Sequence, residues 1–170
     1  TLPHGATGEL VVCGAHVMLG YWRRSDETAE RLRPGPRPGE RVLRTGDLFR
    51  SDAEGYLHFV GRTDDIIKSR GEKVSPVEVE HALCRLPEVL DAAVVGVPDE
   101  ALGQAIHAHV RLRPGARLAD RDVIRHCLAH LESHMAPQRV HFVETLPVTD
   151  SGKVRRASLT DPSLPTPTPP

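Results

Sequence analysis

The stretch SPVEVEHALCRLPEVLDAAVVGV, residues 75–97, decides the fold because it holds one helix and one strand with clear limits. A capping box with proline at the first helical position opens the helix at Ser75. We expect the helix to end near Leu86, because Pro87 cannot continue it. The apolar run Leu90–Val97 then predicts a buried strand.

Working outward from this stretch, the same kinds of element appear on both sides. A glycine-containing turn precedes it, and strand and helix patterns follow it in alternation. The order β, α, β, β, α, β predicts a small α+β domain with helices on a mostly antiparallel sheet. The further elements are a hairpin from Ile66 to Ser69 with the turn Arg70–Glu72, strand Ala105–Leu112 after a Pro98-Asp99 turn, a helix from about Ala119 to Ser133, and strand Val140–Val143.

The first third of the chain is β-rich and has no helix long enough to close a core. It therefore predicts the C-terminal edge of a larger domain, a β-rich remnant over residues 1–61. We expect a second domain over 62–160, with the boundary in the charged run Arg62–Asp65, and a disordered proline-rich tail over 161–170. The expected elements here are strands Gly8–Cys13, Arg41–Arg44 and Tyr56–Val60, and a short helix with Ser25 as its N-cap, which the residues 34–39 end.

Composition excludes several classes of partner. The net charge is -1 over 170 residues, without the positive surface that nucleic acid or an anionic membrane requires. Neither a signal peptide nor a membrane-spanning stretch is evident. Three separated cysteines, Cys13, Cys84 and Cys127, fit reduced thiols, so we expect a cytoplasmic protein.

Lysine is scarce in this chain. Only three of the 22 basic residues are lysines, and Lys68, Lys73 and Lys153 all lie in turns marked by glycine. An ammonium on a flexible stem can follow a charge that develops during a reaction, whereas guanidinium suits fixed pairing. A lysine retained here is a candidate for function, although codon bias explains the pattern equally well.

Four segments resemble the later core motifs of the adenylate-forming superfamily, which includes acyl-CoA synthetases, adenylation domains of peptide synthetases and luciferase. They appear in the superfamily's order, and the resemblance covers the chain from Thr7 to Leu159. The segments are Gly8–Trp22 (GELVVCGAHVMLGYW), Arg44–Leu48 (RTGDL), Gly61–Glu80 (GRTDDIIKSRGEKVSPVEVE) and Pro147–Arg156 (PVTDSGKVRR).

The resemblance implies roles in nucleotide binding and domain movement. It implies that the carboxylate of Asp47 accepts the ribose hydroxyls of ATP and that Arg62 binds the same nucleotide. It also implies that Asp64 lies at an interdomain hinge. From the residues alone, Thr45–Asp47 is most simply a turn with an Asx hydrogen bond, and the charges at 62–65 are a solvated cluster.

The resemblance assigns the two catalytic lysines to different steps. It implies that Lys153 bridges the attacking carboxylate and the α-phosphate during adenylation, and that Lys68 enters the site for thioester formation. The loop with Gly71 then lines the path of the CoA pantetheine. Gly71 itself indicates either a positive φ or the close passage of another chain. The alternative for both lysines is a solvated turn residue.

Histidines suggest one competing site. His126, His130 and His134 are spaced at i, i+4 and i+8 on the expected second helix. Two helical turns separate the outer pair, which is too far for one ion to bind all three. We therefore expect no metal site of this chain's own.

The superfamily's phosphate loop and acyl pocket have no counterpart in this sequence. The expected function is thus the C-terminal part of an ATP-dependent acid-CoA ligase, inactive without an N-terminal AMP-binding half supplied in cis or in trans. ATP, a carboxylic acid and CoA are the expected substrates, with Mg²⁺ bound by that other half. The alternatives are a noncatalytic module for CoA, pantetheine or a partner protein, and part of a peptide synthetase; the motif at Ser75–Glu80 favours the CoA ligase.

Overall fold

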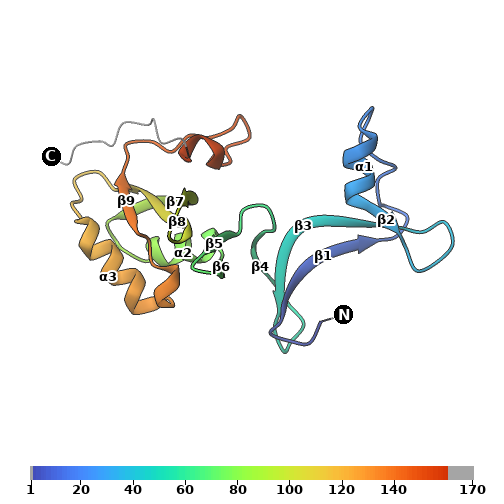
Figure 1. Ribbon diagram of the computed structural model, residues 1–170, viewed down its shortest axis with the longest axis horizontal. Helices are drawn as coiled ribbons and strands as arrows, with labels where there is room; N and C mark the ends of the chain where they lie inside the picture. The colour runs from blue at the N-terminus through green and yellow to red at the C-terminus, as the bar shows by residue number, and fades with distance from the viewer. Residues whose placement is uncertain (1, 161–170) are drawn as a thin grey trace. The chain divides into compact units, whose positions relative to one another are not determined.

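A computed structural model describes residues 2–160 of the chain (Figure 1). It divides into two compact units, with the division between Asp64 and Asp65. Within the described residues, no helix is both long and apolar enough to cross a membrane. The predicted disordered tail, residues 161–170, lies outside the described residues.

The first unit is built on a four-stranded antiparallel sheet with one short helix. Strand β3 is central, since β1, β2 and β4 all pair with it. The short strand β2 was not predicted. The elements are β1 (Thr7–Cys13), α1 (Ser25–Arg31), β2 (Leu32–Pro34), β3 (Arg41–Ser51) and β4 (Leu57–Arg62).

Two predictions for this unit were wrong. Ser25 does not cap α1, because it is the first helical residue and Arg24 holds the cap position without a side-chain hydrogen bond. The strand predicted over Arg41–Arg44 continues to Ser51, so Thr45–Asp47 lies within β3 and is not a simple turn. Apolar alternation fades after Arg44, which is why the sequence pattern ended too early.

The second unit is an α+β domain, as predicted. Its sheet has the order β6-β5-β8-β7, and β9 joins β8 as the one parallel pair among the strands of the described chain. The elements are β5 (Ile67–Ser69), β6 (Glu72–Val74), α2 (Pro76–Leu83), β7 (Val89–Asp99), β8 (Gly103–Leu112), α3 (Asp120–His130), β9 (Arg139–Phe142) and two 3₁₀ turns, η1 (Ser133–Met135) and η2 (Arg156–Leu159).

Each face of this sheet has its own buried cluster. The larger cluster packs α2 and α3 against one face through residues that include Leu83, Ile106 and Val123. On the other face, Leu159 of η2 packs against Ala93 and Val95. The C-terminal segment is therefore attached to the sheet by a buried leucine.

Several limits in this unit differ from those predicted. Helix α2 is capped by the hydroxyl of Ser75, as expected, but ends at Leu83 with Cys84 as its C-cap. Helix α3 ends at His130, so His134 lies in η1 and not on the helix. Pro98 and Asp99 belong to β7, pairing with Gln104 and Gly103. The turn follows them, and the Asp99 carboxylate accepts hydrogen bonds from the amides of Ala101 and Leu102 at 2.9 Å each.

Candidate functional site

Asp47 and Arg62, the two residues expected to bind nucleotide, are in contact. They are register partners on β3 and β4, and the Nη1 of Arg62 donates to the Oδ1 of Asp47 at 2.6 Å. Both side chains are partly exposed, Asp47 at 32% and Arg62 at 43%. The sheet therefore presents an acceptor and a planar donor side by side to solvent.

A carboxylate in β1 fixes the backbone before Asp47. The Oε1 of Glu9 accepts from the amide of Gly46 at 3.0 Å, and its Oε2 accepts from the Nε of Arg44 at 2.9 Å. Burial acts to raise the pKa of Glu9, but the hydrogen bonds from Arg44 and Gly46 outweigh it and hold that pKa below its ordinary value. Gly46 has a φ of 76°, where β1 and β3 lose regular register, so the strand bends at this point.

Asp64, the expected hinge residue, is the last residue of the first unit. Its Oδ2 accepts from the Nη2 of Arg31 at 3.3 Å and lies 3.8 Å from the Nη2 of Arg62. The hydrogen bond to Asp64 raises the pKa of Arg31. Two arginines and two aspartates thus form a continuous charged chain along this edge.

Lys68 and Gly71 lie on the β5-β6 hairpin of the second unit. The two-residue turn uses Arg70 at φ 56° and Gly71 at φ 82°, the positive values that a type I′ turn requires. Since no atom of the structure lies within 4 Å of a Cβ placed on Gly71, its positive φ is the reason for glycine here. Lys68 is exposed while its neighbours Ile67 and Ser69 are buried, so its side chain lies on the open face of the hairpin.

Hydrogen bonds from two of its main-chain amides fix the position of this hairpin. The Oε1 of Gln104 accepts from the Lys68 amide at 2.7 Å, and the Arg70 amide donates to the carbonyl of Leu102 at 2.9 Å. Lys73 is the register partner of Lys68 across the hairpin. Two of the chain's three lysines therefore lie directly opposite each other.

Lys153 lies in a turn closed by its own hydrogen bonds. The Thr149 amide donates to the Lys153 carbonyl at 2.8 Å, and the Lys153 amide donates to the Thr149 hydroxyl at 3.2 Å. Gly152 supplies a φ of 79°. The Lys153 side chain is exposed, and no ion pair to it occurs among the described residues.

Arg156, three residues after Lys153, forms an ion pair with Glu80. The Nη2 of Arg156 donates to both oxygens of Glu80, at 2.7 and 2.9 Å. Burial raises the pKa of Glu80, while Arg156 and the amide of Val94 act in the opposite direction. The C-terminal segment is thereby linked to α2 and β7.

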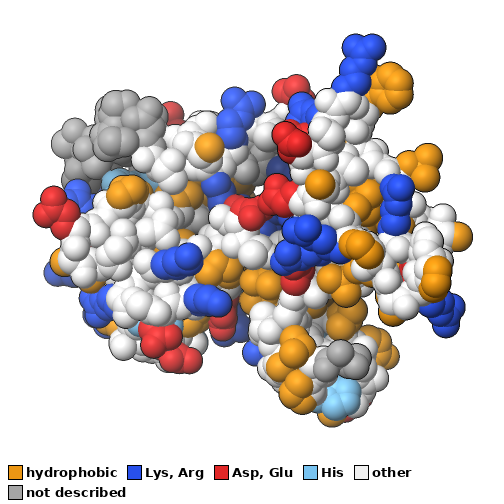
Figure 2. Space-filling model, turned by 45° about the vertical axis from the view of Figure 1, so that its right-hand side comes forward, with side chains coloured by type: hydrophobic (Ala, Val, Ile, Leu, Met, Phe, Trp, Pro, Cys, Tyr) orange, Lys and Arg blue, Asp and Glu red, His pale blue; other side chains and the backbone are white. Residues whose placement is uncertain are grey.

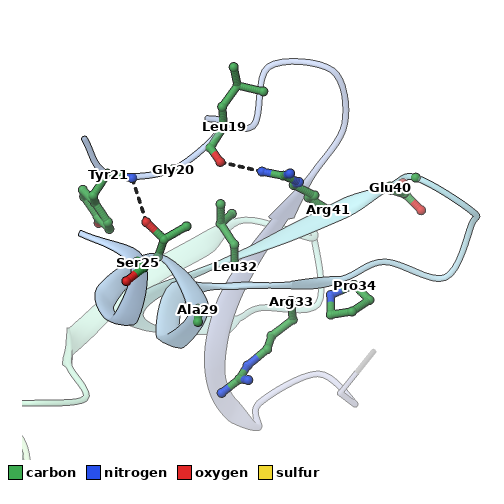
Figure 3. Close-up of a pocket in the computed structure, with 12 residues that line it drawn as sticks. Leu19, Gly20, Tyr21, Ser25, Ala29, Leu32, Arg33, Pro34, Glu40 and Arg41 are labelled. Carbon is green, nitrogen blue, oxygen red and sulfur yellow. Dashed lines mark hydrogen bonds between the residues drawn. The ribbon is translucent and has the colours of Figure 1, made fainter. Parts of the chain in front are cut away.

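A groove in the first unit is lined by none of the six predicted site residues (Figure 3). It has a volume of about 690 Å³ and lies between α1, β2 and the loop before α1. Arg41 donates to the carbonyl of Leu19 at one side, and the Tyr21 amide donates to the hydroxyl of Thr28 at 2.9 Å. This groove thus does not connect the predicted residues.

Two of the histidines considered as metal ligands have backbone partners. The Nε2 of His126 lies 2.9 Å from the carbonyl oxygen of Ala82, and the Nδ1 of His130 lies 2.9 Å from that of His126. Across residues 2–160, no three metal-ligating side chains are arranged to hold an ion.

Comparison with known proteins gives the class of protein. Residues 78–153 match the family described as the AMP-binding enzyme C-terminal domain. The chain is 43% identical to sulfoacetate–CoA ligase of Cupriavidus necator over 157 residues, which are 92% of this chain and 30% of that protein.

Solved structures agree with this class. ATP-bound MatB from Rhodopseudomonas palustris matches at a TM-score of 0.84 and 33% identity, covering 94% of this chain and 31% of that one. The o-succinylbenzoate CoA synthetase MenE from Bacillus subtilis, solved with its acyl-adenylate intermediate, matches at a TM-score of 0.83 and 31% identity, with 94% and 31% covered.

The fold and these likenesses match the C-terminal region of the acid-CoA ligase family. The chain belongs to the adenylate-forming superfamily. It spans about 30% of the length of each of these three proteins.

Four supporting residues were not singled out from the sequence: Glu9, Glu80, Gln104 and Arg156. One signal was present for Glu80, because a carboxylate on the buried side of α2, next to Val79, needs a charged partner. Its partner Arg156 lies 76 residues away in sequence, and spacing alone could not pair them.

Proposed function

We propose that this chain forms the C-terminal part of an ATP-dependent acid-CoA ligase. Such an enzyme joins a carboxylic acid to ATP, giving an acyl adenylate and pyrophosphate, and then transfers the acyl group to the thiol of CoA with release of AMP. The observation that carries the proposal is the likeness to sulfoacetate–CoA ligase over 92% of this chain. The superfamily motifs around Asp47, Lys68 and Lys153 all fall within the chain.

In this proposal Lys153 serves the first half-reaction. Its ammonium offsets negative charge that develops between the acid's carboxylate and the α-phosphate of ATP. The exposed side chain and the self-closed turn support this role, because a fixed main chain aims a flexible stem. Lys68 serves the thioester step, with the open space at Gly71 beside the path of pantetheine.

Asp47 and Arg62 bind the nucleotide in the proposed enzyme. Since one oxygen of Asp47 already accepts from Arg62, the other is available to a ribose hydroxyl. Asp64 is the proposed hinge, about which the second unit turns between the two half-reactions. The phosphates of ATP and their Mg²⁺ are bound by the N-terminal half.

The first unit exposes apolar surface suited to contact with that N-terminal half (Figure 2). Leu19, which lines the groove described above, is 86% exposed, and Trp22 is 84% exposed. Tyr56, Leu57 and Phe59 are exposed at the other end of the sheet, at 70%, 55% and 46%. Exposed aromatic and aliphatic groups of this size commonly mark interaction surfaces.

A chimera tests the proposal. This chain replaces the matching C-terminal portion of the C. necator sulfoacetate–CoA ligase, and sulfoacetate, ATP and CoA are supplied. We expect Lys153→Ala to suppress sulfoacetate-dependent ATP-pyrophosphate exchange while thioester formation from supplied acyl adenylate continues. Lys68→Ala should have the reverse effect.

Lys153→Arg is the matched control because it keeps the charge and changes its shape. A fully active Arg variant would remove the argument from lysine scarcity. A folded chimera without activity, beside an active parent ligase, would instead favour a noncatalytic module that binds CoA or a partner protein.

A further inference from the structure

Arg156 is bound by acids from two separate parts of the second unit. Its Nη2 donates to both oxygens of Glu80 in α2, and its Nη1 lies 3.8 Å from the Oδ2 of Asp65. Asp65 is the first residue of this unit, directly after the proposed hinge. Because 3.8 Å exceeds hydrogen-bond length, Glu80 is the main partner and Asp65 an electrostatic one.

Glu80 is itself fixed in place. Its side chain is 15% exposed, and its Oε1 also accepts from the amide of Val94 in β7 at 2.8 Å. A carboxylate with so little exposure depends on its partners, since water cannot replace them. Arg156 thus binds a carboxylate, that of Glu80, whose position is fixed by its hydrogen bond with β7.

Arg156 is three residues after Lys153, and Val154 between them packs against the cluster that contains Leu159. The Arg155 amide donates to the carbonyl of Pro147 at 2.8 Å, which closes the base of the turn. Beyond Arg156, Leu159 is 6% exposed against Ala93 and Val95. Apolar burial holds the segment on the sheet without fixing its direction, whereas a charged hydrogen bond is directional.

We propose that Arg156 is a positioning residue, which through Glu80 orients the turn that presents Lys153 for adenylation. The inference rests on the proposed function for the role of Lys153, but the contact itself belongs to this chain alone. Arg156 does not touch the reactants in this scheme. It acts by keeping the main chain of residues 149–155 at one angle to the sheet.

Amide hydrogen exchange on the full 170-residue chain tests the contact without any activity. In Arg156→Ala, the amides of Gly152, Lys153 and Arg155 should exchange about tenfold faster or more, while those of β8 change less than about twofold. Arg111→Ala is the matched control, because its ion pair with Asp91, between β7 and β8, lies outside the C-terminal segment. It should leave the turn unchanged.

Two more variants guard against simple loss of folding. Glu80→Gln keeps an acceptor for the Val94 amide and removes only the charge, so it should also release the turn. The reversed pair Arg156→Glu with Glu80→Arg should restore protection at least in part. Unchanged exchange at the turn in both Arg156→Ala and Glu80→Gln would overturn the inference.

The chimera supplies a readout that a general structural role would not give. Arg156→Ala should lower kcat for ATP-pyrophosphate exchange by about 10- to 100-fold, since small displacements of catalytic groups have effects of this size. Thioester formation from supplied acyl adenylate, and the KM for CoA, should stay within about twofold.

The two proposals can fail separately. If Lys153→Ala does not suppress exchange, the proposed function fails whatever Arg156 does. If Lys153→Ala suppresses it and Arg156→Ala does not, only the positioning role is wrong.

Discussion

The guanidinium of Arg62 donates to the carboxylate of Asp47 at 2.6 Å, across neighbouring positions of β3 and β4. The two side chains proposed to bind nucleotide are therefore one ionic unit before any ligand arrives. A nucleotide must share Asp47 with Arg62, so the effects of removing them should be coupled.

In the chimera, we expect Asp47→Ala to cost about 1.5 to 3 kcal/mol in transition-state binding, measured from kcat/KM for ATP, because ribose hydroxyls lose a charged acceptor. The double variant with Arg62→Ala should cost less than the sum of the single variants. Asp52→Ala is the control, since Asp52 pairs with His58 at 2.7 Å, away from Asp47. Unchanged ATP kinetics in Asp47→Ala would argue for a purely structural carboxylate.

Gln104 should matter for the thioester step only. Its Oε1 accepts from the Lys68 amide at 2.7 Å, so Gln104→Ala removes one of the hydrogen bonds that hold the β5-β6 hairpin and should slow thioester formation while sparing pyrophosphate exchange. The loss of one such hydrogen bond should also lower the free energy of unfolding by about 1 kcal/mol. Gln138→Ala is the matched control, because the Gln138 side chain also accepts from a main-chain amide of this sheet, that of Ile106 in β8, at 2.6 Å. Equal effects of the two variants on both half-reactions would contradict a specific role.

Because of three neighbouring histidines, His107, His109 and His141, we expect the free energy of unfolding to fall in acid. The rings of His109 and His141 stack at 4.8 Å, and that of His107 lies 5.2 Å from His141. Burial, with the nearby positive charge of the other histidines, lowers the pKa of His109 from about 6.5 to about 4, and a backbone hydrogen bond with Leu159 acts the other way. Burial also lowers the pKa of His107 and of His141.

The unfolded chain therefore binds more protons than the folded one between pH 6.5 and about 4. Stability from neutral His109 is present above pH 6.5 and should be lost as the pH falls to about 4, by about 2 to 3 kcal/mol. Urea unfolding across this range measures it. His109→Gln should flatten the dependence, whereas His81→Gln, on the exposed face of α2, should not. The same slope in all three proteins would contradict the prediction.

Gly71→Ala should lower the free energy of unfolding of the second unit by about 1 to 2 kcal/mol. The reason is conformational, since φ is 82° and a Cβ would meet no other atom. Gly71→Asn should cost less, because asparagine tolerates this region better. Urea unfolding of both variants measures the difference, and equal stabilities would show that the turn relaxes to another type.

The sequence predicted the second unit well where local chemistry determines the structure. Ser75 caps α2 because its hydroxyl accepts a hydrogen bond from the amide of Glu78, three residues later, at 3.4 Å. The turn at Gly71 followed from one glycine. Pro98 was misassigned because a proline and an aspartate resemble a turn, although both can lie in the last positions of a strand when the aspartate caps the turn that follows.

The residues of the proposed site come from sequence motifs, whereas the contacts that support them could not be predicted. Asp47, Lys68 and Lys153 follow from motifs, yet Glu9 reaches Gly46 from 37 residues away and Arg156 reaches Glu80 from 76. Such pairs depend on how strands pair and helices pack. No local pattern contains that information.

The segments that carry the two proposed catalytic lysines are attached to the same sheet. The Lys68 hairpin bonds to β8, and the segment after Lys153 packs on β7 through Leu159. The distance between the two backbone segments that carry the lysines is therefore fixed once the second unit has folded. If the second unit turns about Asp64, as proposed, one rotation has to exchange one amine for the other, and the spacing of the two turns fixes how large that rotation must be.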